Sequence, residues 1–190
     1  MQTQSTGQGS DDFTTFMRAY QDMVFSTAAR LAGNDAQAQD IAQETFIRAF
    51  ENFPQLQASA TPGGWLKTVA TNLSINYLTR HRRRWRLFSD LQPSTADEDG
   101  DSPFECAVPD TLLQDLGAEQ RGELIQAALR RLPEHQRVPL VLYHFEEMSY
   151  QDIAERLKVS LTKVKTDIRR GRAALLPSLA IGVAHETLED

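Results

Sequence analysis

The hydrophobic residues of the first third of the chain recur at three- and four-residue spacing, which is the spacing of one face of an α-helix. A first helix is expected from about residue 13 to Leu31, and Gly33-Asn34 is a typical helix stop. Its inward face is predicted to carry Phe13, Phe16, Met17, Tyr20, Val24, Ala28 and Leu31.

Two further helices are expected before residue 87. Asp35 is the expected N-cap of the second helix, and Pro54 lies just beyond its expected end. A turn is expected at Pro62-Gly63-Gly64, before the third helix. The inward residues are predicted to be Ile41, Ala42, Phe46, Ala49, Phe50 and Phe53 in the second helix, and Trp65, Leu66, Val69, Leu73 and Tyr77 in the third. Three or four helices on one aromatic-rich core is the predicted architecture.

The last third of the chain predicts a helix-turn-helix. Ile153, Ala154 and Leu157 fall on one side of its first helix, which Ser149 is expected to cap. The turn is expected near Val159-Ser160, and Ser160 can cap the second helix. There Val164 and Ile168, four apart, form the inward stripe. The outward face is predicted to hold Thr162, Lys163, Lys165, Thr166, Arg169 and Arg170.

Charge divides the chain into parts. The whole chain has 190 residues and a net charge of -6, but residues 87–120 hold nine acidic residues and no basic one. That block is rich in turn-forming residues, so it is expected to be a flexible acidic linker. We therefore predict an all-α protein with two small helical domains, an N-terminal bundle and a C-terminal helix-turn-helix bundle. The expected parts are a disordered tail at 1–12, the bundle at 13–86, the linker at 87–118, the second bundle at 119–177 and a tail at 178–190.

Composition argues against several classes of protein. The first twelve residues are polar and acidic, so no secretory signal is visible, and the apolar stretch 173–184 is too short to span a bilayer. A single cysteine, Cys106, cannot form an internal disulfide or a thiolate metal cluster. We find no P-loop, no nucleophile elbow and no spaced metal ligands. We expect a cytoplasmic protein without cofactor, metal or catalytic residues, and not an enzyme.

Two basic segments predict binding to nucleic acid. From Arg156 to Arg172 there are seven Lys or Arg residues and one acidic residue, and a basic helix fits the major groove of DNA. Five arginines also occupy seven positions from Arg80 to Arg86, after the amides Asn72 and Asn76, which suits a strand-binding surface. The alternatives are a solvated cationic face on an amphipathic hairpin and arginines at a helix end favoured by the helix dipole. For Trp65, a position in the core is the favoured alternative.

Three motifs in this order resemble those of the extracytoplasmic-function (ECF) group of bacterial sigma factors. The segment 40–50 is similar to the helix of that family that docks on core RNA polymerase. The segment 65–78 is similar to the part that opens and reads the proximal promoter element. Leu132-Pro133-Glu134-His135-Gln136-Arg137 and the helix-turn-helix at 149–172 are similar to the domain that reads the distal element. The resemblance covers about residues 13–86 and 121–176.

The resemblance implies a role for each matching residue. The clamp coiled coil of the largest polymerase subunit would be contacted by Asp40, Gln43, Glu44 and Phe46. The proximal promoter element would be bound by Trp65, Lys67, Asn72, Asn76, Arg80, Arg82, Arg83 and Arg84. The distal element would be bound by Thr162, Lys163, Lys165, Thr166, Arg169 and Arg170. The implied partners are core polymerase, through the clamp and the flap, promoter DNA and an anti-sigma factor, without membrane insertion.

The chain departs from the family pattern at several positions. Gln37 and Gln39 are neutral where acidic residues are usual, which suggests the hypothesis that phosphorylation nearby, for instance at Thr45, restores negative charge. Asp167 stands where an arginine is common, so Asp167→Arg is expected to strengthen DNA binding. Lys158 replaces a frequent turn glycine, and Thr162-Lys163 replaces a Gly-Thr pair.

The main rival is a transcription regulator that works without polymerase, with an N-terminal dimerisation or sensing domain. The helix-turn-helix fits both classes, whereas the docking segment and the asparagine-bearing basic helix fit only the sigma factor. The acidic linker is either a plain spacer or a mimic of nucleic acid. The sequence names neither the promoter nor the inducing signal.

Overall fold

The computed structural model describes residues 5–89 and 117–186, and side chains over narrower ranges, chiefly 11–80 and 120–177. All of the regular structure in these ranges is helical, which confirms the all-α prediction. The chain divides into two compact units, residues 1–80 and 81–190. The expected linker, with Cys106, falls mostly outside the described residues.

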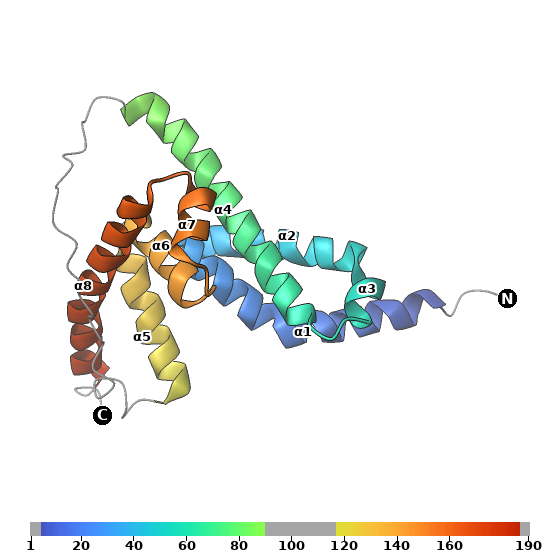
Figure 1. The fold of residues 1–190 in the computed structure, drawn as a ribbon. Coiled ribbons are helices and arrows are strands. Elements are labelled where there is room, and N and C mark those ends of the chain that lie inside the picture. The colour runs from blue at the N-terminus through green and yellow to red at the C-terminus, as the bar shows by residue number, and fades with distance from the viewer. Residues whose placement is uncertain (1–4, 90–116, 187–190) are drawn as a thin grey trace. The chain divides into compact units, whose positions relative to one another are not determined.

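The first unit is built from α1 (Ser5–Ala32), α2 (Asp35–Glu51), the short α3 (Phe53–Gln57) and α4 (Pro62–Ser89), whose last turns continue past the unit's boundary (Figure 1). α1 begins at Ser5, so it includes residues that the sequence assigned to a disordered tail.

Two clusters of buried side chains hold these helices together. In the first cluster, Val24 of α1 meets Ala49 of α2 and Leu66 of α4, and all three are fully buried. Phe13 packs beside it, with its ring edge-on to Phe53 at 5.1 Å between centroids. The second cluster consists mainly of small residues on α1 and α2, which let the two helices approach closely: Ala28, Ala29, Ala32, Ala38 and Ile41.

Local chemistry sets the boundaries of the helices, in places differently from the prediction. Gly33 takes a positive φ of 79° after α1, as expected for a helix stop. The N-cap of α2 is Asn34 and not Asp35, because Asn34 is extended and its side-chain oxygen accepts from the backbone N–H of Gln37 at 2.9 Å. Pro54 lies in the first turn of α3, where its missing N–H leaves no hydrogen bond unmade.

The expected turn at Pro62-Gly63-Gly64 is instead the first turn of α4. Gly63 suits the packing there, because a Cβ on it would lie 3.1 Å from a ring carbon of Tyr20 in α1, a tight contact. The glycine thus lets the start of α4 lie close to α1.

The second unit contains α5 (Ala118–Arg131), α6 (Glu134–His144), α7 (Tyr150–Leu157) and α8 (Leu161–Glu186) (Figure 1). α8 packs against each of the other three helices. Leu142, Ile153 and Ile168 from α6, α7 and α8 are almost completely buried. α8 continues past Pro177 to Glu186, so most of the expected tail at 178–190 is helical.

The helix-turn-helix forms as predicted from α7 and α8. The Ser149 hydroxyl accepts from the backbone N–H of Asp152 at 3.1 Å, and the Ser160 hydroxyl accepts from that of Lys163 at 3.2 Å. Val164 and Ile168 are each 1% exposed, which confirms the inward stripe. These caps and this stripe fix which side of α8 faces outward.

The turn between α7 and α8 carries backbone strain. Lys158 closes α7 with φ 55° and ψ 47°, the left-handed conformation that favours glycine. A side chain with a Cβ pays about 1–2 kcal/mol there.

Lys158→Gly is therefore expected to raise the free energy of unfolding by about 1 kcal/mol, since glycine relieves the strain at a cost in chain entropy. Urea denaturation of the full chain, followed by circular dichroism, measures this change. Lys158→Ala removes the same charge and keeps the strain, so it is the matched control and is expected to give no gain. Equal stability of the Gly and Ala variants would contradict the account of the turn.

Candidate nucleic-acid and protein interfaces

An apolar groove of about 810 Å³ lies between α1 and α2 in the first unit. Ile47 and Phe50 line it and are 56% and 60% exposed, which is unusual for side chains of this size. A continuous exposed apolar surface of this kind is typical of a site that binds another protein. The apolar lining is Phe13, Met17, Phe25, Ala42, Phe46, Ile47 and Phe50, and the polar lining is Gln21, Asp22, Gln39, Gln43 and Glu51.

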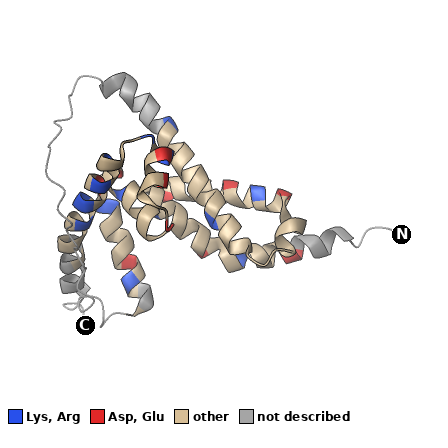
Figure 2. Cartoon of the chain, in the orientation of Figure 1, with Lys and Arg blue, Asp and Glu red and all other residues tan. Residues whose placement is uncertain are grey.

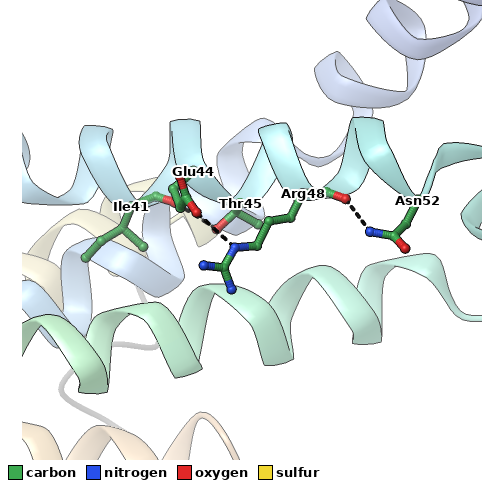
Figure 3. A network of polar contacts seen from close by, with 5 residues as sticks. All are labelled: Ile41, Glu44, Thr45, Arg48 and Asn52. Atoms are coloured by element: carbon green, nitrogen blue, oxygen red, sulfur yellow. Dashed lines mark hydrogen bonds and ion pairs between the residues drawn. The ribbon is translucent and has the colours of Figure 1, made fainter.

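Two of the four predicted polymerase-binding residues lie in this groove. Gln43 is exposed and Phe46 is half-buried, and both line it. Asp40 is exposed on α2 but does not line the groove. Glu44 accepts from Nε of Arg48 at 2.9 Å and also lies outside it (Figure 3).

Ile47 and Phe50 were missed as candidate site residues. The sequence placed Phe50 on the core face and left Ile47 unassigned. Gln43, Phe46, Ile47 and Phe50 are spaced three or four apart, so they share one face of α2. The spacing that places these four residues on one face is therefore visible in the sequence, but the same spacing is also typical of a helix face buried in a core.

Thr45 cannot take the regulatory role suggested for it. Its side chain is fully buried, and its hydroxyl donates to the carbonyl of Ile41 at 2.7 Å (Figure 3). A kinase cannot reach this hydroxyl in the folded chain, so the phosphorylation hypothesis is wrong for this residue.

One face of α4 carries polar residues at four-residue intervals. Asn72, Asn76 and Arg80 are each four apart, and Asn76 and Arg80 are exposed. Asn72 is half-buried, and its Oδ1 atom is buried and accepts no hydrogen bond in the described structure. A buried acceptor without a partner costs free energy, so this oxygen would be stabilised by a donor that reaches it.

The other residues predicted to bind the proximal promoter element do not form one described surface with these three. Trp65 packs against the first core cluster, which agrees with its reading as a core residue. Lys67 is half-buried. Arg82, Arg83 and Arg84 lie on the last turns of α4, where side chains are outside the described residues.

The outward side of α8 is basic, as predicted (Figure 2). Thr162, Lys163, Lys165 and Arg170 are exposed, while Thr166 and Arg169 are half-buried. The six predicted residues thus lie on one side of the helix, four of them exposed and two partly covered.

Asp167 does not belong to this outward surface. It is 5% exposed, and Oδ2 pairs with Nζ of Lys163 at 3.1 Å. The carboxylate is paired with Lys163 and is not part of the exposed basic surface. The expected gain in DNA binding from Asp167→Arg stays a prediction, and the structure adds that the larger cation would have to be accommodated at a buried position.

Arg137 in α6 is a buried cation with a structural partner. Its Nη1 donates to the carbonyl of Leu132 at 3.2 Å, which links α6 to the end of α5. Burial lowers the pKa of Arg137 from its ordinary value, while the nearby charge of Glu134 acts in the opposite direction.

A cluster of polar and aromatic side chains joins α6, α7 and α8. Nε of Arg172 in α8 donates to Nε2 of His144 at the end of α6, at 3.1 Å. Burial first, and the charge of Arg172 second, lower the pKa of His144 below its ordinary value of 6.5. Tyr143 stacks on Tyr150 of α7 at 4.6 Å between centroids, and burial followed by the hydrogen bond to Tyr143 raises the pKa of Tyr150.

The described residues offer neither a membrane-spanning helix nor a metal site. No helix in them is long and apolar enough to cross a membrane. They also contain no group of three or more His, Cys, Asp or Glu side chains placed to hold a metal ion.

Comparison with known proteins covers both units. The family model for sigma-70 region 2 matches residues 16–84, and that for sigma-70 region 4 matches residues 122–175. The chain is 38% identical to the ECF RNA polymerase sigma factor SigE of Mycolicibacterium smegmatis over 86% of its own length, and spans 60% of that relative. It is 31% identical to the ECF RNA polymerase sigma factor SigW of Bacillus subtilis, over 89% of each chain.

One solved structure is also similar: the sigma factor RpoE in complex with the anti-sigma factor NepR from Bartonella quintana. The identity is 20% and the TM-score 0.45, over 88% of this chain and 96% of that one.

Asp167→Arg is expected to lower the free energy of unfolding by about 1–3 kcal/mol, because it places a large cation at a buried position and removes the partner of Lys163. Urea denaturation of the full chain measures the change. Glu155→Arg reverses an exposed carboxylate on α7 and serves as the control, with an expected change within about 0.5 kcal/mol. An Asp167→Arg variant as stable as the control would show that the position is not a buried one.

The pair of His144 and Arg172 is expected to make stability depend on pH. Because the folded-state pKa of His144 lies below 6.5, the unfolded chain binds more protons, so stability is full above about pH 6.5 and falls as the pH drops through the folded-state pKa. Thermal unfolding from about pH 8 to about pH 5 measures this. His144→Gln keeps an acceptor that does not titrate, so its midpoint should fall less in acid. If the unfolding midpoints of the two proteins fall by the same amount between these pH values, His144 is not the group that makes stability depend on pH.

Proposed function

The chain belongs to the sigma-70 family as a sigma factor of the ECF type that acts in transcription initiation, and we propose how its surfaces divide that work. The groove between α1 and α2 docks on core RNA polymerase, α4 binds the opened strand of the proximal promoter element, and α8 reads the distal element. The exposed apolar groove that contains Ile47 and Phe50 carries the docking assignment.

The shape and chemistry of the groove favour a helical partner. A long apolar groove between two helices suits the apolar face of an amphipathic helix, whose side chains enter at three- and four-residue spacing. The clamp coiled coil of the largest polymerase subunit, implied by the resemblance, presents such helices. Gln39 and Gln43 are neutral, which leaves Asp22 and Glu51 as the two carboxylates of the lining, so docking should combine apolar contact with these charges.

The polar face of α4 supports the assignment to the opened strand. Amide groups such as those of Asn72 and Asn76 can pair with the edges of unpaired bases, and Arg80 can contact phosphate. Holding an unpaired base offsets local unstacking, which costs a few kcal/mol. The basic outward side of α8 fits the major groove in the same way, with Lys165 and Arg169 able to reach base edges or phosphates.

The remaining assignments follow from this role. The chain would catalyse no reaction, since RNA synthesis belongs to the polymerase, and it would act in the cytoplasm, where polymerase and promoters are found. Contact of the second unit with the polymerase flap and control by an anti-sigma factor stay predictions from the family resemblance. A regulator that works without polymerase would not account for the region 2 match over residues 16–84.

Run-off transcription tests the proposal. Purified core polymerase with the chain is expected to make discrete transcripts from some genomic fragments that core polymerase alone leaves silent. Stable operator binding by a dimer, without transcription in the presence of core polymerase, would contradict the proposal and favour the rival regulator.

Ile47→Ala and Phe50→Ala are each expected to weaken binding to core polymerase about tenfold, which is typical of an apolar anchor at an interface. Fluorescence anisotropy of the labelled chain, titrated with core polymerase, measures the affinity.

Gln55→Ala changes an exposed residue on α3 outside the groove and is the matched control. Circular dichroism should show that all three variants stay folded, because Ile47 and Phe50 are mostly exposed. Unchanged polymerase affinity in folded Ile47 and Phe50 variants would exclude the groove as the docking surface.

A further inference from the structure

Arg172 lies on the DNA-facing side of α8 but was not among the predicted DNA-binding residues. Lys165, Arg169 and Arg172 are spaced four and three residues apart, so they share one face of the helix. Arg172 is two turns, about 10 Å, further along the helix than Lys165. When the first turns of a recognition helix meet the bases, a residue two turns further along approaches the DNA backbone.

The guanidinium of Arg172 is held by side chains at the end of α6. Its Nε donates to His144 at 3.1 Å, and its Cζ lies 5.4 Å from the centre of the Tyr143 ring. Its charge also acts on Tyr150 of α7, where it lowers the pKa against the effect of burial. Tyr143 in turn packs edge-on against the imidazole of His144 at 4.9 Å. An arginine side chain held in this way has already lost much of its rotamer freedom before any ligand arrives.

These contacts leave part of the guanidinium unused. Arginine always carries its proton, so its Nε is a donor and His144 must accept through Nε2, with the imidazole neutral and its own proton on Nδ1. The bond to His144 uses one of the five N–H donors of the guanidinium. The planar fork suits the two oxygens of a phosphate, to which arginine binds in a bidentate manner.

We propose that Arg172 contacts a phosphate of the DNA backbone beside the distal element, and that His144 is the positioning residue that orients it. The inference rests on the proposed role of α8 as the DNA-reading helix. It adds a contact that fixes the position of the helix along the duplex. Phosphate contacts of this kind position a protein on DNA without reading sequence. The charged and titratable groups around His144 that act on this arrangement are Arg172 of α8, Tyr150 of α7 and Tyr143 of α6 itself.

The salt dependence of DNA binding tests the contact with Arg172. The full-length chain is titrated onto a short labelled DNA duplex of mixed sequence at several salt concentrations. Arg172→Ala is expected to weaken binding about threefold to tenfold and to reduce the slope of log affinity against log salt by about one, because one phosphate contact is lost. Arg121→Ala, on α5 and outside the helix-turn-helix, is the control and should leave the slope unchanged.

The outcomes separate a phosphate contact from a purely internal one. If Arg172→Ala weakens binding without changing the slope, or changes neither, the proposed contact is overturned. Arg169→Ala serves as a reference and should also reduce the slope by about one. If Arg169→Ala leaves the slope unchanged, the assignment of α8 as the DNA-reading helix fails instead, which is a separate result. Arg172→Lys keeps the charge but loses the fork, so it should keep the slope and bind more weakly.

Two variants of His144 test the positioning role. His144→Gln can place an oxygen close to the position of Nε2 and is expected to bind the duplex within about twofold of the unchanged protein, whereas the shorter His144→Asn cannot reach Arg172 and should lose about threefold or more. Thermal unfolding shows that each variant is folded at the temperature of the titration. Equal affinity of the Gln and Asn variants would overturn the role of His144.

Discussion

The packing of α1 against α2 is the interaction on which the first unit depends. Ala28, Ala29 and Ala32 of α1 meet Ala38 and Ile41 of α2, and such small side chains let two helix backbones approach closely. Nearer the start of α1 and the end of α2, aromatic side chains replace the alanines, and Phe13 meets Phe50 edge-on at 5.0 Å. The exposed groove lies along this same pair of helices, so the contact that holds the bundle together also shapes the proposed polymerase-docking surface.

In the second unit, α8 has a comparable double role. Val164 and Ile168 bury one side of the helix in the core, and this burial leaves Lys165 exposed and Arg169 half-buried on the other side. The caps Ser149 and Ser160, whose hydroxyls accept from backbone N–H groups, set where α7 and α8 begin. Stability and the proposed contact with DNA therefore use opposite faces of one helix.

The elements that the sequence predicted are those that rest on local chemistry. The helices, the serine caps and the inward stripe of α8 follow from spacing and from hydrogen bonds within a few residues. Ile47 and Phe50 were missed because three- and four-residue spacing does not tell a buried face from a docking face. Asp167 was misplaced because its burial depends on packing within the second unit. The bond between Arg172 and His144 joins residues 28 apart, which no local pattern reveals.

The central claim is that the groove between α1 and α2 docks on core polymerase while α8 reads promoter DNA. A cryo-electron microscopy map of the chain with core polymerase and a promoter fragment that it transcribes tests both parts at once. The account predicts that a helix of the clamp coiled coil covers Ile47 and Phe50, and that α8 lies in the major groove with Lys165 and Arg169 toward the DNA. A map in which Ile47 and Phe50 face solvent, or α8 lies away from the duplex, would contradict it.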